Sequence, residues 1–218
     1  MSYLKWNEKT ITDFTDKNII KMYDDGYVFT RLGRGIMQQT RSVRIDLSKF
    51  ELTSENRRIL KKTDDLVMVV ENLPLKNYNY SIGKLAKDFY ESKFGPKIMS
   101  AQKIKEMLTD RENSNWNTLF TYSDIGYAIC FVGSTLLHYS YPFYDLNKAP
   151  NDMGMGMMLR AITYAKDLGL KYIYLGSLQR LGDVYKLQFE GLEWYDEKKW
   201  STDLAAVKKI LSSDKMKA

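Results

Sequence analysis

Three apolar stretches decide the fold of this chain: NTLFTY (117–122), GYAICFV (126–132) and STLLHYSYPFY (134–144). They follow one another with short Ser, Asp and Gly turns between them, which is typical of an antiparallel meander of β-strands. The stretch MGMGMMLRAITYAKDLGL (153–170) then has apolar residues at helical spacing and leads directly into the apolar KYIYLGS (171–177). A meander, a glycine-containing turn, a helix and a further strand predict an α+β domain.

The residues before the meander predict a mixed region of helices and strands. A helix is expected over residues 9–25, with Thr15 or Asp16 as its N-cap. In RSVRIDLSKF (41–50), apolar and polar residues alternate, which is typical of a half-buried strand. Further short helices are expected from Ser54, from Ser81 and over about 100–108.

The composition is that of an ordinary globular protein. The 218 residues are 44% hydrophobic and 13% aromatic with only 4 Pro, which excludes a disordered or collagen-like chain. No apolar run approaches the ~18 residues of a membrane span, and the N-terminus lacks the apolar core of a signal peptide. The single Cys130 excludes a disulfide framework, and the lone His138 excludes a His/Cys metal site. We therefore expect a cytoplasmic protein that does not bind membranes.

Positive charge is concentrated in one part of the sequence. The formal net charge is +6, and residues 26–62 alone contain nine basic and three acidic residues, an excess equal to that of the whole chain. The nine cations are Arg31, Arg34, Arg41, Arg44, Lys49, Arg57, Arg58, Lys61 and Lys62. Such a cluster favours a polyanionic partner such as a phosphate backbone, or else forms a solvated cationic face.

The turn before the helix at 153–170 reads Asn-Asp-Met-Gly-Met-Gly (151–156). GNAT-type acyltransferases place Gln or Arg, two residues, Gly, one residue and then Gly or Ala at this turn, and their order of meander, turn, helix and strand is similar. The resemblance implies an α+β, GNAT-type fold in which backbone N–H groups of the turn bind a pyrophosphate or another acyl carrier. Asn151 departs from that pattern, and a plain loop-to-helix junction with buried methionines accounts for the same residues.

Other motifs extend the comparison along most of the chain. They are Gly26-Tyr27 with Arg31, the arginines and Phe-x-x-Ser pattern over 41–58, YPFYD (141–145), GLKYIYLGS (169–177), and Tyr185-Lys186 followed by Phe189, Glu193 and Trp200. In this order and spacing they resemble the aminoacyl-tRNA–protein transferases, the arginyl- and leucyl-transferases of the N-degron pathway. The likeness runs from Gly26 to Trp200.

This resemblance implies an aminoacyltransferase. The enzyme would move Arg or Leu from aminoacyl-tRNA to the α-amine of proteins with acidic N-terminal residues, creating a degradation signal. Residues 1–99 would then be a basic N-terminal α/β region for tRNA and acceptor recognition, packed on a GNAT-like transferase domain at 100–218. Of the two donor types, the resemblance favours arginyl, with leucyl as the alternative. We expect a monomer whose partners are aminoacyl-tRNA and acidic protein N-termini.

The family's cysteine cluster has no counterpart here. The corresponding stretch is IMQQTR (36–41), which contains no cysteine. We therefore expect no iron–sulfur cluster, no metal and no cofactor other than aminoacyl-tRNA as co-substrate. Ser177, Val184 and Gly191 also depart from the family pattern, which leaves both the donor amino acid and the acceptor residue open.

Three residues are candidates for the chemistry. The ester of aminoacyl-tRNA is already activated, so the reaction needs positioning and removal of a proton from the acceptor ammonium. Asp145 and Glu193 are the candidate proton acceptors, or else structural carboxylates. Lys186 would bind acceptor-stem phosphates or the developing oxyanion, or else is a surface lysine.

Eight further residues are candidates for substrate binding. Arg41, Arg44 and Arg31 would bind an acidic acceptor side chain bidentately, or else tRNA phosphate. The aromatic and glycine candidates are Tyr144 and Tyr185, which would stack on the terminal adenine, and Gly154, Gly156 and Gly176, which allow close backbone approach.

Two other hypotheses about the function remain open. The first is a GNAT enzyme that acetylates a small amine or peptide from acyl-CoA, although such an enzyme does not need the basic cluster between Arg31 and Lys62. The second is a non-enzymatic N-degron or RNA-binding module that kept the fold and lost the chemistry.

Overall fold

The computed structural model describes residues 3–214 of the chain. It consists of two compact units, each assembled from separate segments of sequence. Unit 1 contains Met1–Glu51, Gly133–His138 and Ala165–Ala218, and unit 2 contains Leu52–Val132 and Tyr139–Tyr164. Neither unit is a continuous piece of chain.

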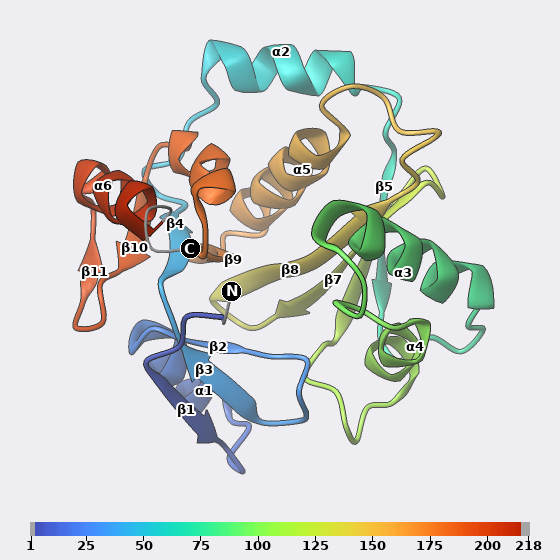
Figure 1. Cartoon of the computed structure of the whole chain (residues 1–218), viewed down its shortest axis with the longest axis horizontal. Coiled ribbons are helices and arrows are strands. Elements are labelled where there is room, and N and C mark those ends of the chain that lie inside the picture. Colours follow the sequence, from blue (N-terminus) through green and yellow to red (C-terminus); the bar gives the residue numbers. More distant parts are fainter. Residues whose placement is uncertain (1–2, 215–218) are drawn as a thin grey trace. The chain divides into compact units, whose positions relative to one another are not determined.

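Unit 1 begins with a small antiparallel sheet and a helix (Figure 1, blue). The strands are β1 (Asn7–Thr10), β3 (Ile36–Gln39) and β2 (Tyr27–Phe29), in that order. Helix α1 (Asp16–Asp24) starts after Thr15, whose hydroxyl accepts from the N–H of Asn18. The helix expected over residues 9–25 is therefore shorter, because residues 7–10 pair with β3 instead.

The larger sheet of unit 1 places β4 (Ser42–Asp46) between two antiparallel neighbours. One is β9 (Tyr172–Ser177), which also pairs in parallel with β8 over Leu136–His138. The other is β10 (Leu192–Tyr195), which pairs with β11 (Trp200–Ser201). A short 3-10 helix, η1 (Leu181–Gln188), links β9 to β10, and α6 (Leu204–Asp214) follows β11.

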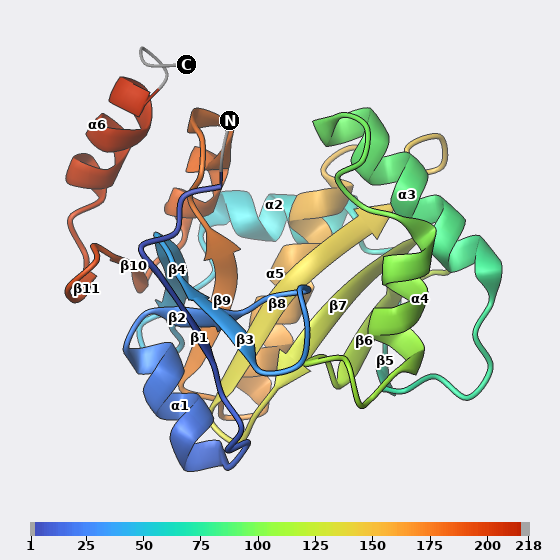
Figure 2. The ribbon, with the colours of Figure 1, turned by 60° about the horizontal axis from the view of Figure 1, so that its bottom comes forward.

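Unit 2 contains the rest of the meander, in the order β8, β7, β6, β5 (Figure 2). These strands are β8 (Leu136–Tyr144, with residues 139–144 in this unit), β7 (Gly126–Val132), β6 (Thr118–Tyr122) and β5 (Met68–Asn72). The helices are α2 (Ser54–Lys62), α3 (Tyr80–Phe94), α4 (Ala101–Thr109) and α5 (Met153–Asp167, which ends in unit 1). Phe120, Ile129 and Leu159 are fully buried in its core.

The expected α+β, GNAT-type fold is confirmed. The meander β6–β7–β8 is followed by the helix α5 and then by β9, which runs parallel to β8. Two details differ from the expectations: Thr53 rather than Ser54 caps α2, and the exposed strand β5 was not anticipated. No helix within residues 3–214 is long and apolar enough to cross a membrane.

Candidate functional site

Arg44 lies in the middle of the large sheet of unit 1 and is almost completely buried. Its Nε donates to Glu193 Oε2 at 2.8 Å, and its Nη1 donates to Asp24 Oδ1 at 3.0 Å and to the Tyr174 hydroxyl at 3.2 Å. The guanidinium lies 3.8 Å from the ring centre of Tyr172. Burial opposes its charge, but Tyr174 and Glu193 outweigh that effect and raise the pKa of Arg44.

This arrangement joins two candidates, Arg44 and Glu193, in one buried ion pair. Removing one partner of such a pair leaves the other charge buried and uncompensated. The geometry therefore favours a positioning role for Arg44, which holds the Glu193 carboxylate on β10. Arg41 is also buried and donates to the Leu178 carbonyl at 3.4 Å, whereas Arg31 is half-buried in the turn between β2 and β3.

Gly176 and Lys186 meet at a β-bulge at the end of β9. The pairing of β4 with β9 shifts register between Ser42 and Arg44, and Gly176 adopts a φ of 78° there. A side chain at Gly176 would point at Lys186 Nζ, 3.8 Å from its Cβ, and that ammonium donates to the Ser177 carbonyl at 3.1 Å. Bulges of this kind re-aim side chains at strand ends.

Ser177, Gln179 and Asp183 complete a polar group around Lys186 that the sequence reasoning missed. We call the set of Gly176, Ser177, Gln179, Asp183 and Lys186 the Lys186 cluster. Gln179 Nε2 donates to Ser177 Oγ at 2.9 Å, and Asp183 Oδ2 accepts from the N–H of Gln179 at 2.8 Å. Burial lowers the pKa of Lys186, although Asp183 opposes that effect. The sequence contained one signal for this cluster: Asp183 stands at the start of η1, where an acidic side chain can cap the helix.

Tyr3 and Leu4 contact this cluster. The Leu4 N–H donates to Gln179 Oε1 at 2.8 Å, and the Tyr3 hydroxyl lies 2.9 Å from Ser177 Oγ. Tyr185, the other candidate of this segment, is exposed, and the Lys186 ammonium lies 5.8 Å from the centre of its ring.

His138 is fully buried on strand β8, where it pairs with Tyr174 of β9. Its Nδ1 lies 2.9 Å from the Tyr23 hydroxyl. Burial, and secondarily the charge of Lys186, lower the pKa of His138 to about 3, so the imidazole is neutral at physiological pH. Cys130, in unit 2, is fully buried as well. Within residues 3–214, no group of three or more His, Cys, Asp or Glu side chains could hold a metal ion.

In unit 2, Tyr144 and Asp145 lie where β8 ends. The Tyr144 ring packs on Phe89, with ring centres 4.7 Å apart, and burial raises its pKa. Asp145 Oδ1 accepts from the N–H of Asn147 at 2.9 Å, and Oδ2 lies 3.9 Å from Lys148 Nζ. These contacts fix the turn after β8.

The two glycines of the turn have different surroundings at the start of α5. A Cβ on Gly154 would lie 3.4 Å from the Tyr144 ring, an ordinary contact distance. A Cβ on Gly156 would lie 2.5 Å from Thr63 Oγ1, because α5 and the end of α2 approach closely there. Arg160 reinforces this approach by donating to the Leu66 carbonyl at 2.8 Å. Gly156 therefore serves helix packing.

Helix α2 presents four exposed cations beside the start of α5. They are Arg57, Arg58, Lys61 and Lys62. Two of them approach the Asp152 carboxylate, which precedes α5: Lys62 at 3.6 Å and Arg58 at 3.9 Å. These four residues belong to the basic cluster of residues 26–62, but the sequence pattern favoured Arg31, Arg41 and Arg44 as the ligands. These side chains lie at the surface, where phosphate can reach them, and Arg58 also pairs with Glu55 on the same helix.

No protein-family model matches the chain. Curated relatives named aspartate/glutamate leucyltransferase are similar to it. The one from Ruegeria pomeroyi is 25% identical over 167 residues, covering 73% of this chain and 60% of that protein. Those from Leptospira interrogans and Acinetobacter baumannii are 28% and 25% identical, covering 62% and 76% of this chain and 54% and 63% of theirs.

The chain thus spans somewhat over half the length of these relatives. The resemblance to the aminoacyl-tRNA–protein transferases that its motifs indicated is confirmed. Among solved structures, L-PGS from Bacillus licheniformis matches with a TM-score of 0.47 at 14% identity, covering 89% of this chain and 56% of that one. FemX matches with a TM-score of 0.45 at 9% identity, covering 75% and 60%.

Proposed function

We propose that this chain, a sequence relative of the aspartate/glutamate leucyltransferases, transfers a leucyl group from Leu-tRNA to the α-amine of polypeptides that begin with Asp or Glu. The new N-terminal leucine would serve as a degradation signal. The observation that carries the proposal is the similarity to those enzymes over up to three quarters of the chain. It favours leucyl over arginyl as the donor, the reverse of the order suggested by the motifs alone.

The exposed cations of α2 support a tRNA donor. A phosphate backbone bound by Lys and Arg releases counterions, so its affinity comes from cations that solvent can reach. Arg57 and Lys61 lie one helical turn apart and are exposed, whereas Arg44 is buried among its partners. We therefore assign phosphate contacts to α2 and not to Arg44. Tyr185 in unit 1 and Tyr144 in unit 2 remain alternative candidates for stacking on the terminal adenine.

In the proposed reaction, the neutral α-amine of the acceptor attacks the ester carbonyl carbon. The C–N bond forms, the C–O bond to the ribose breaks, and the ribose hydroxyl leaves with a proton. Because an α-ammonium has a pKa of about 7.8, a weak base suffices to deprotonate it. Glu193, held by Arg44, and Asp145 are the proposed proton acceptors.

Lys186 is the proposed ligand of the developing oxyanion or of an acceptor-stem phosphate. Its ammonium is held beside the backbone bulge of Gly176, where the chain offers no side chain to block a ligand. Asp183 and Gln179 keep the segment that carries Lys186 in place. For the acidic acceptor side chain, Arg41 and Arg31 remain the proposed cations.

The proposal is tested by an incorporation assay with purified protein. Radiolabelled Leu-tRNA or Arg-tRNA is mixed with peptides that begin with Asp, Glu, Lys or Ala, and acetyl-CoA is supplied in a parallel reaction. We expect label from Leu-tRNA on the Asp and Glu peptides only. The variant Lys186→Ala should lower the rate by about 100-fold, as expected when one charge-stabilising donor is removed. The matched control Lys208→Ala removes an exposed lysine of α6 and should transfer at the wild-type rate.

Each other result has a definite meaning. Acetylation without tRNA-dependent label would overturn the proposal in favour of an acyl-CoA enzyme. Equal label on the Lys and Ala peptides would refute the acidic acceptor. Wild-type rates for Lys186→Ala would remove Lys186 from the site and leave the activity standing.

A further inference from the structure

The outer edge of β5 is open. β5 is the last strand in the sheet of unit 2, and among the described residues, 3–214, it pairs only with β6 (Figure 2). Val67, which directly precedes this strand, is 65% exposed. Val69 and Val70, within the strand, are 50% and 37% exposed. Natural sheets usually protect such an edge with lysine, proline, a bulge or a covering segment. The strand Met-Val-Val-Glu-Asn carries one charge, and its register with β6 is unbroken.

The register shows which backbone groups face outward. The Leu73 N–H donates to the Asn117 carbonyl at 2.9 Å, and the Ser123 N–H donates to the Val67 carbonyl at 3.0 Å. Because antiparallel pairs alternate, the odd-numbered residues of β5 bond to β6. The N–H and C=O groups of Met68, Val70 and Asn72 therefore point away from the sheet. Within residues 3–214, no other segment pairs with them.

A cleft of about 450 Å³ adjoins this edge. Val70 and Asn72, whose backbone groups face outward, line it together with Thr118 of β6 and Tyr164 of α5. Side chains of a strand added to β5 would alternate between the two faces of the sheet. Every second side chain would thus point to the face that holds the cleft.

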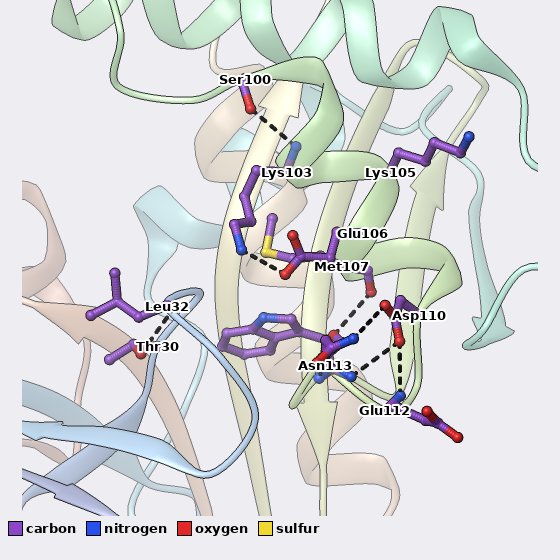
Figure 3. A network of polar contacts seen from close by, with 12 residues as sticks. Thr30, Leu32, Ser100, Lys103, Lys105, Glu106, Met107, Asp110, Glu112 and Asn113 are labelled. Atoms are coloured by element: carbon purple, nitrogen blue, oxygen red, sulfur yellow. Dashed lines mark hydrogen bonds and ion pairs between the residues drawn. The ribbon is translucent and has the colours of Figure 1, made fainter.

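The loop after α4 brings a cation to the cleft. Arg111 and Trp116 from this loop also line it. Asp110 fixes the loop, since its Oδ1 accepts from the N–H of Glu112 at 3.0 Å and its Oδ2 accepts from Asn113 Nδ2 at 2.8 Å (Figure 3). The cleft is therefore lined by aromatic and aliphatic groups, by the polar side chains of Asn72, Asn117 and Thr118, and by one guanidinium.

We propose that the free edge of β5 binds the acceptor polypeptide as an added strand, with a large side chain in the cleft and a carboxylate at Arg111. Backbone hydrogen bonds would supply affinity and the cleft would supply selectivity. This inference rests on the proposed function, whose acceptor is a polypeptide. A second copy of this chain fits less well, because the side chains that its own β5 carries on that face, Met68, Val70 and Asn72, include no carboxylate for Arg111.

The test compares two Asp-initiated peptides with the variant Val70→Pro. One peptide has about 15 residues rich in Val, Thr and Glu, and the other is a dipeptide, shorter than the roughly 3 residues of the shortest ordinary strands. Proline at position 70 removes an outward N–H but no bond to β6, a position that edge strands tolerate. We expect kcat/KM for the long peptide to fall about 10-fold and that for the short peptide to stay unchanged. The isosteric control Val70→Thr, which keeps the N–H, should match wild type with both.

Hydrogen exchange provides a readout that does not depend on transfer. The long peptide should slow exchange at the amides of Met68, Val70 and Asn72, and the short peptide should not. Slowed exchange without any transfer would leave the inference standing while the proposed function fails. Unchanged exchange, together with equal kcat/KM for wild type and variant, would overturn it.

Two further measurements keep the test decisive. If Val70→Pro does not fold, Arg111→Glu takes its place and should weaken binding of the long acidic peptide about 10-fold. Sedimentation at increasing protein concentration identifies self-association. A dimer abolished by Val70→Pro would assign the edge to a second copy and refute the acceptor as its occupant.

Discussion

Single residues of unit 1 show how neighbouring strands change the meaning of a local pattern. The alternation of Val43, Arg44 and Ile45 predicts one apolar and one solvent-facing side of a strand. In the structure Arg44 is buried, because Tyr172 and Trp200 cover its guanidinium and Glu193 pairs with it. The sequence alone suggests that Arg44 binds a ligand, but its guanidinium binds other side chains of the protein instead.

His138 should make the protein less stable in acid. The unfolded imidazole takes up a proton near pH 6.5, whereas the folded one has a pKa of about 3. Between these values the unfolded chain binds more protons, so stability falls as pH falls, by up to about 1.4 kcal/mol per pH unit. Urea unfolding of wild type and His138→Gln between about pH 7 and about pH 5 measures the effect.

The two proteins should diverge across that range, with the wild type losing stability more steeply. Carboxylates titrate mainly below it, so they contribute little to the difference. Parallel curves would mean that His138 is protonated in the folded state. Its contact with the Tyr23 hydroxyl would then hold a charged ring.

At the scale of residues, sequence supplied most of the candidates but not their roles. The pairs Tyr144-Asp145 and Tyr185-Lys186 stand out because they match family motifs. Gln179 and Asp183 did not stand out, because their contacts join residues that strand β9 and helix η1 bring together only in the fold. Burial of Arg41 and Arg44 likewise depends on strands more than 100 positions away.

The meander and α5 follow directly from periodicity, whereas the strands β1 and β5 depend on their partners. The meander and α5 have strong apolar patterns and short turns, so the sequence predicts them well. β1 and β5 are mostly polar or exposed, and they are strands because β3 and β6 pair with them. Such strands carry little signal of their own.

The two glycines of α5 should respond oppositely to alanine. Gly156→Ala would place a methyl group against Thr63, and we expect a loss of about 1–3 kcal/mol in unfolding free energy. Gly154→Ala meets only the Tyr144 ring at ordinary distance and should gain up to about 1 kcal/mol from helix propensity. Thermal and urea unfolding of both variants measure this difference. Equal effects would show that α2 and α5 do not pack closely at Gly156.

Helix α2 should determine much of the salt dependence of tRNA binding. Replacing Arg57 and Lys61 by Gln removes two exposed cations, and we expect the slope of log affinity against log salt to become shallower by about 1.5. The matched control replaces Lys208 and Lys209 of α6, which carry the same charge and are also exposed. Binding of Leu-tRNA at several salt concentrations provides the slopes. If the variant of Lys208 and Lys209 changes the slope as much as the variant of Arg57 and Lys61, tRNA is attracted by the net charge of the protein. In that case α2 does not contact the phosphates.

The chain leaves and re-enters each of its two units. Unit 1 takes three segments of sequence and unit 2 takes two. A division between residues 99 and 100, which the resemblance to the transferases implied, would separate strands that pair within one unit. β4 would lose both of its neighbours, β9 and β10, and β5 would lose β6.

We therefore expect the fragments 1–99 and 100–218 to remain largely unfolded when expressed alone. A strand without its neighbours leaves backbone groups and apolar side chains in water, and a chain of about 100 residues has little stability in reserve. Circular dichroism and urea unfolding of each fragment measure this directly. A cooperative transition in either one would establish an independent domain and support the boundary. Mixing the fragments should regain structure if the strand pairings alone direct assembly, because every partner of β4 and β5 is then present.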